Sequence, residues 1–197
     1  MTNKKILFVV EGKAEQVGLK SYIINHIGLN VDECNIITYK TSIYELYDLL
    51  NKKENDGISL SSILIKEKYV DVDSNFQLDS TFAAVYLVFD FDPQYHKYSE
   101  DKIRYFASRF VDETDEGLLL IDYPMFESLL DIESFDNYQG FENQTTQVIS
   151  SAEYKKIVKK RTCIRDEKNN VYKYINDKGT FIKIAEFNLA KYLKLLG

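Results

Sequence analysis

The sequence has few of the residues that build disulfide frameworks and zinc sites. Its 197 residues include two cysteines, two histidines, two prolines and no tryptophan. Cys34 and Cys163 are isolated, and no CxxC or HExxH spacing occurs, which excludes a disulfide-bonded scaffold and the common zinc motifs. We expect both cysteines to be reduced and partly buried, because free cysteine is among the most buried residue types.

Long apolar segments are also missing. No run approaches the roughly 18 to 20 apolar residues of a membrane span. The N-terminus, MTNKKILFVVEGK, passes from two lysines into a short apolar strand instead of the apolar core of a signal peptide. We therefore expect a cytoplasmic protein with no membrane contact. With 45% hydrophobic and 28% charged residues, the composition is typical of a globular chain.

Charge is distributed unevenly along the chain. Residues 1–150 hold 13 Lys and Arg against 26 Asp and Glu, whereas residues 151–197 hold 12 against 5. A polyanion would be attracted by the second part and repelled by the first, unless metal ions intervened. The alternatives are that the two parts neutralise each other across an internal interface or that the charges are merely solvated.

Apolar runs that are typical of buried strands alternate with helical patterns. Strands are predicted at residues 6–10, 35–39, 83–89 and 117–121, and helices at 14–27, 43–50, 99–111 and 124–130, with a further helical pattern in 58–70. Residues 133–151 are predicted to be a loop, followed by helices at 152–161 and 184–196. This alternation predicts an α/β fold with a mostly parallel central sheet flanked by helices.

Acidic residues follow two of these strands. Asp90 and Asp92 follow the third predicted strand, and alternation would place both on one side, with Phe91 turned away. Two such carboxylates repel unless a cation lies between them, and oxygen ligands at this spacing suit Mg²⁺ or Mn²⁺. Glu11 holds the equivalent place after the first strand, and Gly12 would let the backbone turn and a phosphate approach. The carboxyl ends of strands form the working site of such sheets.

Three segments together resemble the TOPRIM domain of topoisomerases, bacterial primases, small RNA maturases and the OLD-type and RloB-like nucleases of bacterial defence systems. They are VVEGK at 9–13, with Glu15 after it, VFDFD at 88–92, and YPMFE at 123–127. The last is similar to the Pro-x-Phe-Glu element of RloB-like and OLD-like relatives. The resemblance implies a Rossmann-like TOPRIM domain over residues 1–132, in which 58–80 would be an insertion, and leaves 133–197 as a small, basic, helical C-terminal extension.

The resemblance implies roles for five acidic residues. In the family, the glutamate after the first strand is a general acid/base or metal ligand and the DxD pair binds divalent metal. These catalytic and metal-binding roles fall on Glu11, Asp90 and Asp92. Glu15 and Glu127 match positions that would complete a second metal site. Two ions could stabilise both the attacking and the leaving oxygen of a phosphodiester displacement.

Cations gather in the C-terminal extension. They are Lys155, Lys156, Lys159, Lys160, Arg161, Arg165 and Lys168, with Tyr172 and Tyr174 nearby. Interleaved cations and aromatic rings suit single-stranded or structured RNA, and Lys13 would lie beside the phosphate site. RNA is favoured over DNA because no duplex-reading motif occurs and because the resemblance includes families that cut RNA.

These observations predict a Mg²⁺-dependent TOPRIM nuclease. The resemblance implies a tRNA-like substrate and an anti-phage defence setting. No P-loop occurs, which excludes an ATPase within the chain. One alternative is a small RNA-processing maturase of the TOPRIM class, whose residues after the DxD are not matched by Pro93-Gln94-Tyr95-His96. Another is an effector subunit that is active only with an ATPase or sensor partner encoded nearby; a homodimer is left open.

Overall fold

A five-stranded sheet forms the centre of the computed structural model, which describes residues 5–22, 26, 28, 34–67, 82–114, 116–122, 125–145, 147, 149–165 and 177–196. Its strands, in the order β2-β1-β3-β5-β4, are β1 (Lys5–Val10), β2 (Cys34–Thr38), β3 (Phe82–Asp90), β4 (Val111–Asp112) and β5 (Gly117–Asp122). All neighbours pair in parallel except β4, which runs antiparallel to β5. This confirms the predicted α/β class and mostly parallel sheet, an arrangement consistent with a Rossmann-like fold.

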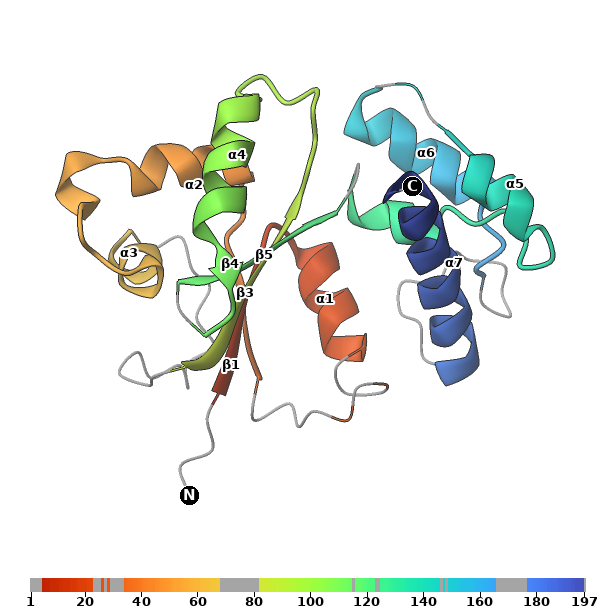
Figure 1. Ribbon diagram of the computed structural model, residues 1–197, viewed down its shortest axis with the longest axis horizontal. Coiled ribbons are helices and arrows are strands. Elements are labelled where there is room, and N and C mark those ends of the chain that lie inside the picture. Colours follow the sequence, from red (N-terminus) through yellow and green to blue (C-terminus); the bar gives the residue numbers. More distant parts are fainter. Residues whose placement is uncertain are drawn as a thin grey trace.

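Helices cover both faces of the sheet (Figure 1). On one side lie α2 (Ile43–Leu50), α3 (Leu60–Lys66) and α4 (Glu100–Arg109), with the short helix η3 (Lys53–Asn55) after α2. On the other side lies α1 (Lys13–Tyr22). Beyond α1 gather η4 (Phe126–Leu130), α5 (Tyr138–Asn143), α6 (Ser151–Arg161) and α7 (Lys178–Leu196). Within the described residues, no helix combines the length and apolar character needed to cross a bilayer.

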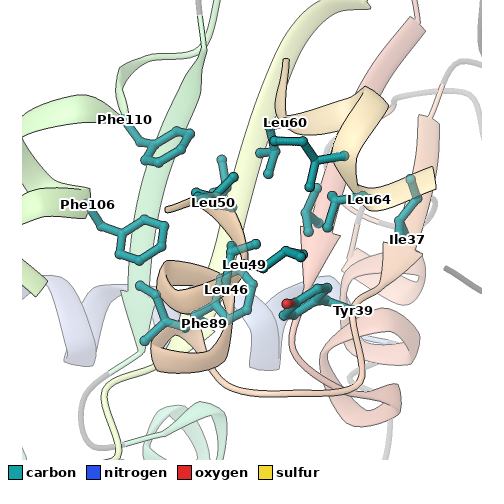
Figure 2. Close-up of a cluster of buried hydrophobic side chains, with 14 of the residues drawn as sticks. Ile37, Tyr39, Leu46, Leu49, Leu50, Leu60, Leu64, Phe89, Phe106 and Phe110 are labelled. Carbon is teal, nitrogen blue, oxygen red and sulfur yellow. The ribbon is translucent and has the colours of Figure 1, made fainter. Parts of the chain in front are cut away.

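Alternation along the buried strands sends successive side chains to opposite faces. Leu7 and Val9 of β1 belong to the large cluster under α2, α3 and α4, part of which Figure 2 shows. Phe8 and Val10 belong instead to a smaller cluster with Leu19 of α1. Burial on both faces explains why β1 is a continuous apolar run, as parallel strands covered by helices are.

Side-chain caps fix the start of several helices. Ser42 precedes α2 and accepts a hydrogen bond from the Glu45 backbone N–H, a role that serine favours at the start of a helix. Ser150 and Glu153 form a reciprocal capping box at the start of α6. Ser99 stands before α4, where the sequence places a cap, but its side chain makes no capping hydrogen bond.

Several boundaries differ from the sequence-based expectation. The predicted loop 133–151 contains α5, whose start is capped by the Asn137 side chain accepting from the Gly140 N–H at 2.9 Å. The polar composition of this segment hid the helix because a cap and the packing of Phe141 stabilise it. Helix α7 begins at Lys178, six residues before the predicted start. Cys163 is exposed, not partly buried as expected.

The remaining differences concern the sheet edge and α1. Val111 and Asp112 form the edge strand β4, although the sequence assigns 111 to the preceding helix. Helix α1 ends at Tyr22, and residues 23–25 and 27 of its predicted extent lie outside the described residues. In the expected insertion, 60–66 form α3, whose Leu64 is buried in the main core, while 68–80 lie outside the described residues.

The C-terminal helices have a core of their own, organised around a buried carboxylate. Asp131 is 4% exposed. Its Oδ1 accepts from Arg161 Nε at 2.8 Å, Arg161 Nη2 pairs with its Oδ2, and the Tyr154 hydroxyl donates to Oδ2 at 3.1 Å. Because Arg161 and Tyr154 both belong to α6, this network joins α6 to the segment after η4.

We expect Asp131→Ala to lower the free energy of unfolding by about 3–5 kcal/mol, since it leaves a half-buried guanidinium without its partner. Asp136→Ala, at an exposed carboxylate five residues away, is the matched control and should have little effect. Chemical denaturation monitored by circular dichroism measures both. Equal stability of the two variants would show that the network contributes nothing.

Candidate active site

Three neighbouring strands end in carboxylates at one edge of the sheet. Asp90 ends β3, Asp122 ends β5, and the two are direct partners in the parallel register. Glu11 follows β1, and its Oε2 accepts a hydrogen bond from the Asp90 backbone N–H at 3.2 Å. The carboxyl ends of β1, β3 and β5 therefore bring together acids that are up to 111 residues apart in the sequence.

The sheet directs these carboxylates toward α1. Val88 of β3 lies in the cluster shared with α1, and side chains repeat their direction every second residue, so Asp90 faces the same way. Asp122 lies beside Asp90 in register and shares its face. The acids therefore lie where the first turn of α1 and the C-terminal helices meet the sheet.

Glu15, in the first turn of α1, enters this group from the side of the helix. It is 4% exposed. A Cβ on Gly12 would lie 2.8 Å from Glu15 Oε2, so the Glu15 carboxylate would have to shift to accommodate it. Gly12 thus leaves the space that the Glu15 carboxylate occupies, and its φ lies outside the left-handed region that favours glycine.

Glu127 reaches the group from η4. Gly18 of α1 lies against the Phe126 ring, where a Cβ would come within 2.6 Å of Cζ. The Phe126 backbone N–H donates to Asp90 Oδ1 at 2.9 Å. Gly18 and Asp90 therefore fix the start of η4 and with it Glu127. Tyr123 and Pro124 of the YPMFE segment lie outside the described residues.

Asp92 lies beyond the end of the strand, so strand alternation does not determine where its side chain points. Strand β3 ends at Asp90, and Asp92 has φ +36°, in the left-handed region that few residues other than glycine adopt. Its Oδ1 accepts from the Ser151 hydroxyl at 2.8 Å and from the Gln94 amide. Asp92 thus links the sheet edge to the start of α6, and its charge is close enough to raise the pKa of Glu11.

Burial and the charges of neighbouring carboxylates raise the pKa values of four of the acids. Burial, with the charges of Glu15 and Asp92, raises the pKa of Glu11 to about 7, although the Asp90 N–H opposes the shift. Burial, followed by the charge of Glu11, raises the pKa of Asp90 to about 8. Burial, with Glu15 and Glu127, raises the pKa of Asp122 to about 7. Burial also raises the pKa of Glu15.

Lys155 brings a positive charge to the same place. Its Nζ lies 3.0 Å from Glu127 Oε1. Partial burial disfavours its charge, but the hydrogen bond to Glu127 and the charges of Asp90 and Glu15 raise the pKa of Lys155 above its ordinary value. The Lys155 ammonium thus interacts with several of these acids, and α6 supplies a positive charge to the cluster.

The donor set fits a divalent cation. Glu15 Oε2, Asp122 Oδ2 and Glu127 Oε2 are buried and accept no hydrogen bond from any residue that the structure describes, an arrangement that is costly for a carboxylate. A hard cation with oxygen ligands would satisfy all three. Within the described part of the chain, no three His, Cys, Asp or Glu residues already converge closely enough to hold one ion together.

The cations predicted to bind nucleic acid divide into two groups. Lys13, Lys156, Lys159 and Lys160 are exposed. Arg161 is paired with Asp131, and Arg165 donates to the backbone carbonyls of Lys159, Lys160 and Thr162 at the end of α6. Lys168, Tyr172 and Tyr174 lie outside the described residues. Part of the basic charge after residue 150 is therefore used within the fold, as in the neutralisation alternative.

Asp122 is the site residue that sequence reasoning missed. The argument that selected Glu11 and Asp90, an acid at the carboxyl end of an apolar strand, applies equally to the run GLLLID. The signal was present in the sequence, but no motif drew attention to it.

No protein-family model, no curated protein and no solved structure matches this chain.

Proposed function

We propose that this protein is a Mg²⁺-dependent phosphodiesterase that cuts nucleic acid, with RNA favoured over DNA. The observation that carries the proposal is the group formed by Glu11, Asp90, Asp122, Glu15 and Glu127, in which three buried carboxylate oxygens have no hydrogen-bond donor among the described residues. The motif resemblance to TOPRIM nucleases supports the same reading. In its most specific form, the proposal includes a tRNA-like substrate and an anti-phage defence setting, as the resemblance implies.

The residues divide the chemistry among them. Glu15, Asp122 and Glu127, together with Asp90, would hold the metal, which when bound polarises the phosphate and activates water. Glu11, whose Oε2 accepts from the Asp90 N–H at the end of β3, would act as the general acid or base. Lys155 lies where it can neutralise charge on a phosphate oxygen, while Asp92 and Ser151 hold the start of α6 in place.

The direct test is cleavage of labelled single-stranded RNA and DNA by the purified chain in Mg²⁺, Mn²⁺ or EDTA. We expect cleavage with either ion and none in EDTA. Sequencing the RNA ends that appear on expression in bacteria would then identify the substrate. Metal-independent cleavage, or intact nucleic acid under every condition, would refute the proposal.

Divalent ions should also stabilise the folded chain, because anything that binds only the folded state adds to its stability. At an ion concentration 100 times the Kd, the gain is about 2.7 kcal/mol, or about 5–10 °C in Tm for a chain of this size. Differential scanning fluorimetry with Mg²⁺, Mn²⁺ and K⁺ measures it. Asp122→Asn should reduce the shift, whereas Asp112→Asn, on the edge strand β4, should retain it in full.

The exposed lysines of α6 should contribute through counterion release. Lys159→Glu with Lys160→Glu is expected to weaken RNA binding and to lower the slope of log K against log salt by about 1.5. Lys52→Glu with Lys53→Glu changes the net charge equally at the end of α2 and serves as the control. Fluorescence anisotropy over a salt series measures both slopes. Equal slopes for the two double variants would show that α6 does not contact the bound nucleic acid.

One observation favours the effector-subunit alternative. Ile182, Leu189 and Leu193 of α7 are 42%, 58% and 57% exposed, and their spacing places them along one side of the helix. Such a stripe is typical of a helix that contacts a partner. Comparing cleavage by the chain alone with cleavage after an ATPase encoded nearby is added would separate this reading from a stand-alone nuclease.

A further inference from the structure

The segment after Asp92 carries an exposed aromatic side chain, Tyr98, which backbone hydrogen bonds tie to Asp92. The Tyr95 N–H donates to the Asp92 carbonyl at 3.0 Å, and the Tyr98 N–H donates to the Tyr95 carbonyl at 2.9 Å. Two successive turns therefore fix Tyr98 relative to Asp92. The position of Tyr98 is therefore linked to that of the Asp90 and Asp92 pair.

Tyr98 rests on a rigid aromatic base. Its ring lies 5.8 Å from that of Phe91, the residue between the two aspartates, and 5.8 Å from that of Tyr44. Tyr44 is fully buried, stacks on Tyr95 and donates its hydroxyl proton to the Phe91 carbonyl. The ring of Tyr98 thus packs on Phe91 and Tyr44, and Tyr44 also binds the backbone between the two aspartates.

The outer part of Tyr98 is free for a ligand. The residue is 40% exposed, whereas Tyr44 is 0% exposed. Its two ring contacts with described residues are close to perpendicular, at 78° and 74°, so neither of these neighbours stacks parallel to it. An aromatic ring that is exposed yet held in place can receive another ring at little cost in conformational entropy.

The charge of this loop is already neutralised. Lys97 Nζ lies 2.7 Å from Glu45 Oε2 and 3.4 Å from Asp48 Oδ2 on α2. The loop therefore offers a substrate an aromatic surface and little positive charge. Phosphate binding would fall to the exposed lysines of α6, the helix whose first residue, Ser151, donates to Asp92 Oδ1.

We propose that Tyr98 stacks against an unpaired base next to the phosphate that is cut, so that the substrate is single-stranded nucleic acid at the cleavage point. The inference rests on the proposed function and adds the substrate class to it. Every base has a π face, so stacking on one ring tolerates all sequences but requires a base that is not enclosed in a duplex. RNA and DNA share this chemistry, and the test includes both.

The test measures binding of a 12-nucleotide single strand that contains 2-aminopurine, as RNA and as DNA, against a duplex of the same sequence. All variants are made in an Asp90→Asn background, which prevents cleavage. Tyr98→Ala should weaken single-strand binding by roughly 5- to 150-fold, the range found for loss of one base–aromatic stack. It should also abolish the quenching of 2-aminopurine while leaving the salt slope unchanged, because stacking releases no counterions.

Two variants keep the result interpretable. Tyr98→Phe retains the ring and should bind as tightly as the parent. Tyr138→Ala removes a tyrosine of similar exposure, 38%, whose ring is also nearly perpendicular to a phenylalanine, but which lies on α5; it should change nothing. If Tyr98→Ala unfolds, Tyr98→Leu keeps the bulk without the π face and is expected to show the same loss.

The outcomes separate this inference from the proposed function. Metal-dependent cleavage by the unmodified chain with equal binding by the Tyr98 and Tyr138 variants would overturn base stacking and leave the nuclease proposal standing. Tighter binding of the duplex than of either single strand would also overturn it. Failure of the unmodified chain to bind or cut any nucleic acid would overturn both.

Discussion

Replacing Asp90 by asparagine is expected to lower Mg²⁺-dependent cleavage by about three orders of magnitude, because metal stabilisation of the transition state supplies several kcal/mol and each 1.36 kcal/mol is a factor of ten in rate. Asparagine keeps the oxygen that accepts from the Phe126 N–H, so the position of η4 should not change. Glu11→Gln likewise keeps the acceptor for the Asp90 N–H and should be comparably inactive. Single-turnover cleavage of a labelled RNA measures both rates.

Asp112→Asn provides the matched control, because it makes the same chemical change at an exposed residue on the edge strand β4. It should retain full activity. The inactive variants should be at least as stable as the parent, since each removes a buried acid whose ionised form is disfavoured. Full activity of either purified site variant would show that the acid cluster takes no part in the reaction.

Stability without divalent metal is expected to fall as the pH rises from about 4 to about 8. The pKa values of Glu11, Asp90 and Asp122 are raised to about 7, 8 and 7 from ordinary values of 4.5, 3.8 and 3.8. Between those limits the folded chain binds more protons than the unfolded chain, so the free energy of unfolding decreases with pH. Each pKa unit of elevation lowers the free energy of unfolding by about 1.4 kcal/mol. Even two units in total would therefore lower it by about 3 kcal/mol, or about 5–10 °C in Tm.

Thermal denaturation in EDTA at pH 5 and pH 8 measures this difference. Asp90→Asn removes the group whose pKa is raised the most and should flatten the pH dependence, whereas Asp112→Asn should leave it unchanged. Saturating Mg²⁺ should restore stability at pH 8, because the ion favours the ionised carboxylates. A chain that is more stable at pH 8 than at pH 5 in EDTA would contradict the raised pKa values.

Hydrophobic periodicity was enough to predict the four parallel strands of the sheet, but not the edge strand β4, because a parallel strand buried on both faces needs a continuous apolar run. Residues 6–10 and 83–89 therefore identified β1 and β3 within one residue. The same logic placed Glu11 and Asp90 at one edge, since parallel strands end together. Ser42 marked the start of α2 because a serine side chain can satisfy a free backbone N–H.

Local patterns failed where packing or capping decides the conformation. A polar segment such as YQGFEN has no strong helical period, yet Asn137 and the burial of Phe141 make it α5. Alternation could not place Asp92, because β3 ends before it and a left-handed φ redirects its side chain. The exposed stripe of α7 likewise became visible only when Ile184 and Phe187 were found buried on the opposite side.

The sequence by itself determined the class of fold and the edge of the sheet where the acids gather, since strand burial and strand direction follow from the order of apolar residues. Only the tertiary structure showed that Asp122 lies beside Asp90, that Gly12 and Gly18 make room for Glu15 and Phe126, and that Lys155 reaches the acids from α6. These contacts join residues far apart in the chain, and their geometry depends on how helices pack on the sheet, which no local pattern records.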